Sequence, residues 1–140
     1  MKIAHKCGFD LFELDCHTNE KIKMIEVDYG LKGFAIVIKL FQKIYGGYGY
    51  YCEWNDELAL LFTLDNGLQR KNQNLVNEIV LACFKRGIFS KEMYKEFGIL
   101  TSEEIQRKYL KAVSKSKVSK IKHEYLLINM NKQRVNTKGE

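Results

Sequence analysis

The chain has 140 residues, of which 46% are hydrophobic, and its formal net charge is +6. This length supports one buried core, and no apolar run is long enough to cross a bilayer. The opening residues lack the apolar centre of a signal peptide, so we expect a cytoplasmic protein that does not bind membranes.

The positive charge is concentrated near the C-terminus. Residues 1–100 carry 13 Lys and Arg against 13 Asp and Glu, whereas residues 101–140 carry 10 against 4. The whole excess therefore lies in the last forty residues. Such a segment favours a polyanionic partner such as DNA, although a solvated basic helix has the same composition.

The cysteines form no CxxC pair, and we expect four reduced thiols, some of them packed in the core. They are Cys7, Cys16, Cys52 and Cys83. With His5 and His17, the first two offer four zinc ligands. However, Cys16 and His17 are adjacent, which makes it awkward for both to reach one tetrahedral ion. The sequence predicts no metal and no other cofactor.

An extended lead-in over residues 1–18 precedes two predicted helices. The first covers 19–29, with Thr18 or Asn19 as its cap and Gly30 at its end. The second covers 31–45 and has the broadest apolar stripe in the chain, so we expect it to be the central helix of the core. The residues of that stripe are Phe34, Ile38, Phe41 and Tyr45.

The stretch "YGGYGYYCEW" over residues 45–54 raises the question of a phosphate-binding loop. Such a loop needs a strand before its glycines and a helix after them, whereas here a helix comes first. We therefore predict a turn followed by a strand over 50–54. Tyr48, Tyr50 and Tyr51 could stack on single-stranded bases, but their place on a strand beside a core helix favours packing.

Two further helices are predicted over 56–63, after the cap Asn55, and over 73–86, before Gly87. Strands at 88–90 and 99–101 are expected to pair with each other. Between them, "KEMYKEF" forms a short helix.

The C-terminal part begins with a helix over 103–115, for which Thr101 and Glu104 fit a capping box. A last strand over 124–130 and a disordered tail over 131–140 complete the expected order.

This order is that of a winged helix-turn-helix. The runs "YGLKGFAIVIKL" and "GILTSEEIQRKYLKA" resemble the N-terminal domain of phage and prophage replisome-organiser proteins, in the neighbourhood of DnaD-like replication initiators. The resemblance extends over about residues 9–130. It implies a mainly α fold with a small antiparallel sheet, namely a winged helix-turn-helix with an additional N-terminal helix and a basic C-terminal helix. The winged-helix core would cover 19–101, with the basic helix and a strand at 102–130 packed on it.

In a helix-turn-helix, the second helix enters the major groove of DNA. Here that helix begins with cations that suit phosphates and amides that suit adenine, although any exposed helix start is polar. The predicted contacts are Arg70, Lys71, Asn72, Gln73, Asn74 and Asn77. A second set on the basic helix suits phosphates alone. It comprises Arg107, Lys108, Lys111, Lys115 and Lys117.

Nothing in the sequence indicates an enzyme. The three histidines are separated, and neither a nucleophile elbow nor an acidic cluster of metal-binding spacing is present.

Two function classes remain open. One is the DNA-binding module of a phage-type replication initiation protein, which acts mainly through phosphate contacts. The other is a protein–protein or self-association scaffold of a primosome-like assembly without direct DNA contact. Its partners would be other replication proteins or further copies of the chain.

Because the spacing of the candidate zinc ligands is poor, native mass spectrometry of the purified protein should show no stoichiometric zinc. One equivalent of zinc that is lost on Cys7→Ser or Cys16→Ser would contradict this expectation.

Overall fold

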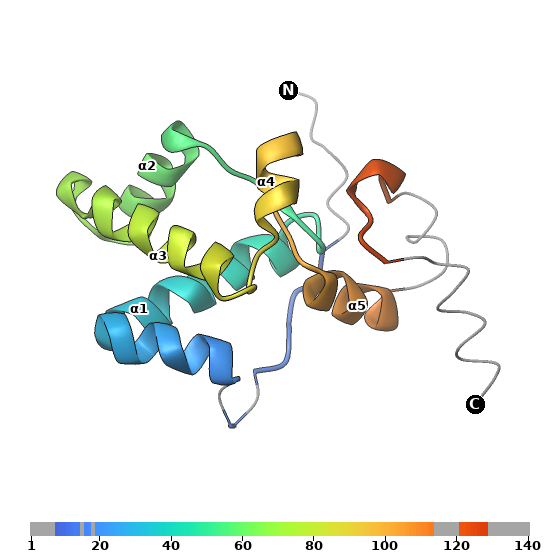
Figure 1. The fold of residues 1–140 in the computed structure, drawn as a ribbon, viewed down its shortest axis with the longest axis horizontal. Coiled ribbons are helices and arrows are strands. Elements are labelled where there is room, and N and C mark those ends of the chain that lie inside the picture. The colour runs from blue at the N-terminus through green and yellow to red at the C-terminus, as the bar shows by residue number, and fades with distance from the viewer. Residues whose placement is uncertain (1–7, 15, 18, 114–120, 129–140) are drawn as a thin grey trace.

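The computed structural model describes residues 8–14, 16–17, 19–113 and 121–128. This part of the chain is mainly helical with one small antiparallel sheet, as predicted (Figure 1). No helix among the described residues is both long and apolar enough to span a membrane. In chain order, the elements are α1 (Glu20–Gly46), β1 (Cys52–Glu53), α2 (Asp56–Asp65), η1 (Arg70–Asn72), α3 (Gln73–Lys85), α4 (Lys91–Phe97), β2 (Ile99–Leu100), α5 (Glu103–Ala112) and η2 (His123–Tyr125).

Helix α1 consists of two helical segments that meet at Gly30, where φ is 74° and ψ is −168°. A positive φ is open to glycine at little cost, which explains why the helix breaks at this residue. The Asn19 side chain accepts a hydrogen bond from the Lys21 N–H at 2.7 Å and caps the first segment. The predictions of a helix over 19–29 and another over 31–45 are therefore confirmed.

The second segment of α1 is the centre of the core. Its residues Val37, Leu40 and Ile44 are fully buried, and α1 packs against α3. The same cluster includes buried side chains from β1, α2, α3, β2 and α5, among them Cys52, Phe62, Val76, Leu100 and Ile105. This confirms the prediction of a central helix.

The sheet joins β1 to β2 in antiparallel register, with Cys52 opposite Leu100 and Glu53 opposite Ile99. The Trp54 N–H extends the pairing by donating to the Gly98 carbonyl at 2.9 Å. Both strands lie within the ranges predicted for them, 50–54 and 99–101.

The predicted strand at 88–90 is wrong, and so is its pairing with 99–101. The N–H groups of Ile88 and Phe89 donate to the Cys83 carbonyl at 2.8 and 3.2 Å, which closes the end of α3. The Ser90 side chain then caps α4. Of the three N–H groups at 88–90, that of Ser90 alone bonds to the predicted partner strand, donating to the Thr101 carbonyl at 2.7 Å. The described residues therefore contain no wing hairpin. Helix α4 occupies 91–97, as predicted.

The start of α5 uses a different cap from the one predicted. The Ser102 hydroxyl accepts from the Ile105 N–H at 3.1 Å, because the Thr101 hydroxyl donates to the Tyr50 carbonyl instead. The helix itself lies within the predicted 103–115 and ends at Ala112, while positions 114 and 115 lie outside the described residues.

The predicted strand at 124–130 is also wrong where the structure describes it, since 123–125 form a 3-10 turn and 126–128 join no sheet. Gln106, which is fully buried, takes the place of a pairing strand. Its Nε2 donates to the Tyr125 carbonyl at 2.8 Å, and its Oε1 accepts from the Leu127 N–H at 2.7 Å. The amide therefore binds the C-terminal segment by its backbone.

A strap over residues 8–14 crosses the end of α1. The N–H groups of Gly8 and Phe9 donate to the carbonyls of Gly47 and Tyr45 at 2.9 and 2.7 Å. Further along the strap, the Phe12 ring lies 5.1 Å from the Tyr45 ring between centroids. A side chain at Gly8 would overlap the backbone oxygens of Tyr45 and Gly47, so only glycine fits this crossing.

Replacing Gln106 by alanine should lower the free energy of unfolding by about 1–3 kcal/mol, because the two part-buried hydrogen bonds to the Tyr125 carbonyl and the Leu127 N–H are lost. Urea unfolding followed by circular dichroism measures this loss. Gln42→Ala, at an exposed position of α1, is the matched control and should change the midpoint little. Equal urea midpoints for the two variants would show that the hydrogen bonds of Gln106 contribute nothing to stability.

Gly8→Ala should detach the strap from the end of α1, since its new Cβ meets two backbone oxygens. Gly46→Ala is the control, because its Cβ would lie 3.8 Å from the nearest atom, the Phe9 carbonyl oxygen, in ordinary contact. Hydrogen exchange at the Phe9 amide should accelerate in Gly8→Ala and stay slow in Gly46→Ala. Unchanged exchange in both variants would contradict the fit of the strap.

Candidate functional site

The start of α3 is the stretch that the sequence assigned to base reading. Helix α2 packs against α3, and η1 joins them after a turn at Gly67, where φ is 77°. Three of the six predicted contact residues are exposed on this edge, Arg70, Lys71 and Asn74. A helix N-terminus carries a partial positive charge, which favours phosphate. The N–H groups of Asn72 and Gln73 already donate to the carbonyls of Gln69 and Arg70.

Two of the other predicted contact residues already have structural roles. The Asn72 Oδ1 accepts from the Gln69 N–H at 3.1 Å, and the Gln73 Nε2 donates to the Asp56 carbonyl at 3.0 Å. These bonds fix the turn before α3 against the start of α2. With Asn77 half-buried, the amide best placed to meet an external partner is that of Asn74.

The basic helix is less positive than its lysines and arginine indicated. In α5, Arg107 pairs with Glu103, and Lys108 pairs with Glu104 at 3.7 Å. Exposed pairs at this i, i+4 spacing contribute about 0.3–0.5 kcal/mol each and still reduce the charge offered to a partner. Lys111 has no ion pair with another described residue.

Most of the C-terminal charge lies outside the described residues. Of the ten basic side chains after residue 100, six are at positions that the structure leaves undescribed. They are Lys115, Lys117, Lys120, Lys132, Arg134 and Lys138. Two of the five predicted phosphate contacts, Lys115 and Lys117, belong to this group. Figure 1 further shows the start of α3 and helix α5 well apart, toward opposite sides of the view.

The tyrosines of the glycine-rich stretch pack inside the protein. Tyr50 and Tyr51 are buried, and Tyr48 stacks on Tyr51 with ring centroids 4.7 Å apart and planes at 5°. Burial, reinforced by the neighbouring tyrosines, raises the pKa of the Tyr51 phenol well above its ordinary value. These tyrosines therefore pack within the protein, as the sequence favoured over stacking on bases.

The described cysteines include both buried and exposed thiols. Cys52 and Cys83 are buried, as predicted for core cysteines, and burial raises the pKa of each thiol to about 12. Cys16 is exposed. Within the described part of the chain, no three His, Cys, Asp or Glu side chains come together as a metal site. His5 and Cys7 lie outside it, so the absence of zinc stays a prediction.

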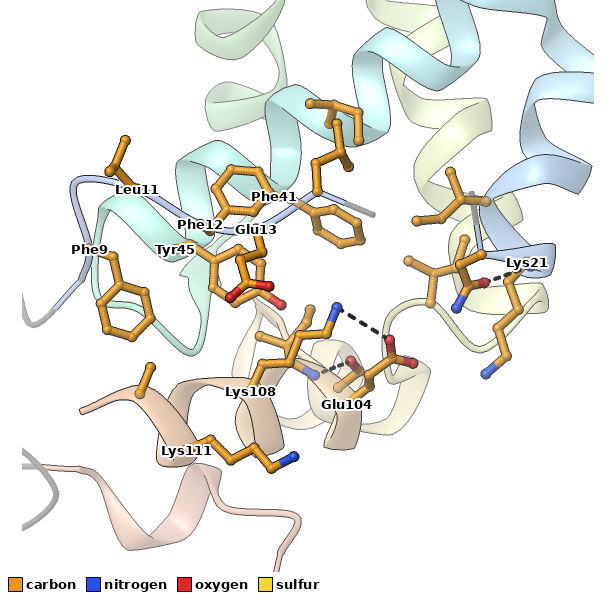
Figure 2. A pocket seen from close by; sticks show the side chains of 18 of the residues that line it. Phe9, Leu11, Phe12, Glu13, Lys21, Phe41, Tyr45, Glu104, Lys108 and Lys111 are labelled. Atoms are coloured by element: carbon orange, nitrogen blue, oxygen red, sulfur yellow. Dashed lines mark hydrogen bonds and ion pairs between the residues drawn. The ribbon is translucent and has the colours of Figure 1, made fainter. Parts of the chain in front are cut away.

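A groove that sequence reasoning did not identify lies between α1, the strap and α5 (Figure 2). Its volume is about 960 Å³. The apolar side chains that line it include Phe9, Phe12, Phe34, Ile38, Phe41 and Ile105. Three of these six, Phe34, Ile38 and Phe41, belong to the apolar stripe predicted on the second segment of α1. The signal in the sequence for this groove was the width of the α1 stripe, which is greater than contact with one neighbouring element requires.

Tyr45 closes one side of this groove (Figure 2). Burial raises the pKa of its phenol well above the ordinary value, and the Glu104 carboxylate raises it further. Tyr45 is therefore a neutral side chain at neutral pH.

Comparison with known proteins adds a family to this geometry. The model of the family described as "Lin1244/Lin1753-like, N-terminal" matches residues 11–105. A protein of Listeria innocua named "Uncharacterized phage-related protein Lin1244/Lin1753" is 37% identical over 128 residues, which cover 89% of this chain. The chain spans about 40% of the length of that relative. No solved structure matches. The chain therefore belongs to the Lin1244/Lin1753-like family, a phage-related family whose N-terminal region it carries.

Proposed function

We propose that this region is the DNA-binding module of a phage-type replication initiation protein. The observation that carries the proposal is the edge at the start of α3, where Arg70, Lys71 and Asn74 are exposed at the positive end of a helix packed on α2. The phage association of the family and the basic C-terminal charge support the same proposal.

The residues of this edge have different roles in the proposal. Arg70 and Lys71 bind phosphates, and Asn74 faces base edges. Asn72 and Gln73 act indirectly, because their hydrogen bonds to Gln69 and Asp56 hold the edge in position. Binding is then dominated by phosphate contacts with limited base reading, and no catalytic step is involved.

The basic helix has a secondary role in this proposal. Lys111, which has no ion pair among the described residues, and Lys115 and Lys117 beyond it add phosphate contacts. Arg107 and Lys108 contribute less, because each is paired with a glutamate of the same helix. Since α5 lies apart from the start of α3, these contacts fall on a different stretch of backbone.

A second candidate, a protein–protein or self-association scaffold, is favoured by exposed leucines on α2 and α3. Leu61 and Leu64 of α2 are 49% and 44% exposed, and Leu81 of α3 is 63% exposed. A helix that is apolar on nearly all sides usually has partners on all sides. A further copy of the chain or another replication protein would bury these leucines.

The double variant Arg70→Glu with Lys71→Glu should weaken duplex DNA binding at least about tenfold, because two phosphate contacts become repulsive. The slope of log affinity against log salt should fall by roughly two for the same reason. Fluorescence anisotropy with labelled duplexes at several salt concentrations measures both quantities. Asn74→Ala should keep the salt slope and reduce only the preference among sequences.

The matched control is Lys91→Glu with Lys95→Glu, two exposed lysines of α4 that change the net charge equally. Equal affinities for the two double variants would attribute binding to net charge alone. If neither variant differs from the parent, the start of α3 is not the DNA contact and the scaffold is the better description.

A further inference from the structure

Apart from Lys108 and Lys111, the lining of the groove between α1, the strap and α5 takes no part in the proposed DNA binding. Its floor is the face of α1 that carries Phe34, Ile38 and Phe41, at intervals of four and three residues. Phe34 and Ile38 are only partly buried, although they lie in the middle of a core helix. On the strap side, Leu11 is 87% exposed. The lining therefore includes apolar side chains that the other described residues cover only in part.

Two neutral polar side chains of the lining, Asn19 and Ser102, are already engaged in the fold. Asn19 accepts from the Lys21 N–H at the start of α1, and Ser102 accepts from the Ile105 N–H at the start of α5. A small polar ligand needs several converging groups that are free to fix its orientation. This groove offers a partner its apolar surface and its charges, which suits a protein segment better.

The charges of the rim favour acidic residues on that segment. The Lys108 ammonium pairs with Glu104, whereas Lys21 and Lys111 have no ion pair with another described residue. Figure 2 shows Lys111 and Lys21 well apart, with Lys108 and Glu104 between them. Glu13 and Glu104 also line the groove and repel anionic groups, so acidic residues of the segment are favoured beside Lys21 and Lys111 and not beside the glutamates.

We propose that this groove binds an amphipathic helix of a partner protein, with apolar residues along one face and acidic residues near both ends. The apolar face of the partner helix packs on Phe34, Ile38 and Phe41. These three residues lie at positions i, i+4 and i+7 along one face of α1. The acidic residues pair with Lys21 and Lys111. This interaction is independent of DNA binding at the start of α3.

The test is a selection from a displayed library of random peptides of about 16 residues, roughly four helical turns, on the immobilised protein. The enriched peptides should share apolar residues at helical spacing with Asp or Glu toward both ends. One of them, synthesised with a fluorophore, then gives dissociation constants by anisotropy. Enriched peptides that lack this acidic pattern would overturn the proposal.

Two pairs of variants locate the binding site of that peptide. Ile38→Ser should weaken it about tenfold, while Val27→Ser, an exposed position of α1 outside the groove, should not. Lys21→Glu should weaken it roughly three- to tenfold, while the exposed Lys23→Glu should not. Circular dichroism confirms that each variant is folded. Equal binding by Ile38→Ser and Val27→Ser would place the peptide elsewhere and overturn the proposal.

Two further measurements separate the alternatives. The affinity of Ile38→Ser and Lys21→Glu for duplex DNA is expected to equal that of the parent, so a failure of DNA binding and a failure of the groove are distinguishable. Light scattering of the parent and of Ile38→Ser reports self-association. A parent dimer that becomes a monomer in Ile38→Ser would identify a second copy of the chain as the occupant and overturn the proposal.

Discussion

The burial of one face of α1 is the constraint on which the other elements depend. Val37, Leu40 and Ile44 are fully buried, and the cluster around them draws on both strands and on α2, α3 and α5. Burial of apolar area is the main favourable term in folding, so each element is positioned by its contact with this face. The consequence is that a neighbouring face of the same helix, with Phe34 and Ile38, faces the groove that the strap and α5 border.

Local signals were enough to predict the helices of this fold. Gly30 breaks α1, Asn55 caps α2, and the range 73–86 differs from α3 by one residue. Strand pairing could not be predicted in the same way, because it depends on which donors other parts of the chain have already engaged. The segment 88–90 has strand-like residues, but the N–H groups of Ile88 and Phe89 close α3. After residue 124, a buried glutamine amide supplies the hydrogen bonds that a strand would have supplied.

The candidate site shows the same limit at the level of side chains. Sequence composition identified the amides at the start of α3, but not that Asn72 and Gln73 bond to Gln69 and Asp56. The pairing of Arg107 with Glu103 was readable, because the i, i+4 spacing is in the sequence. The groove was not readable, since its sides come from segments far apart in the chain that meet only in the folded protein.

The positions of the two proposed surfaces bear on how they would work together. The start of α3 and helix α5, which forms one side of the groove, lie toward opposite sides of the view in Figure 1. A duplex on the first and a helix in the second would therefore not compete for space. Lys111 is the exception, because it lines the groove and also belongs to the predicted phosphate contacts. An acidic residue paired with Lys111 would remove one phosphate contact and leave those of Arg70 and Lys71 intact. A module of this kind can hold DNA and a protein partner together, with only a small cost in affinity for either.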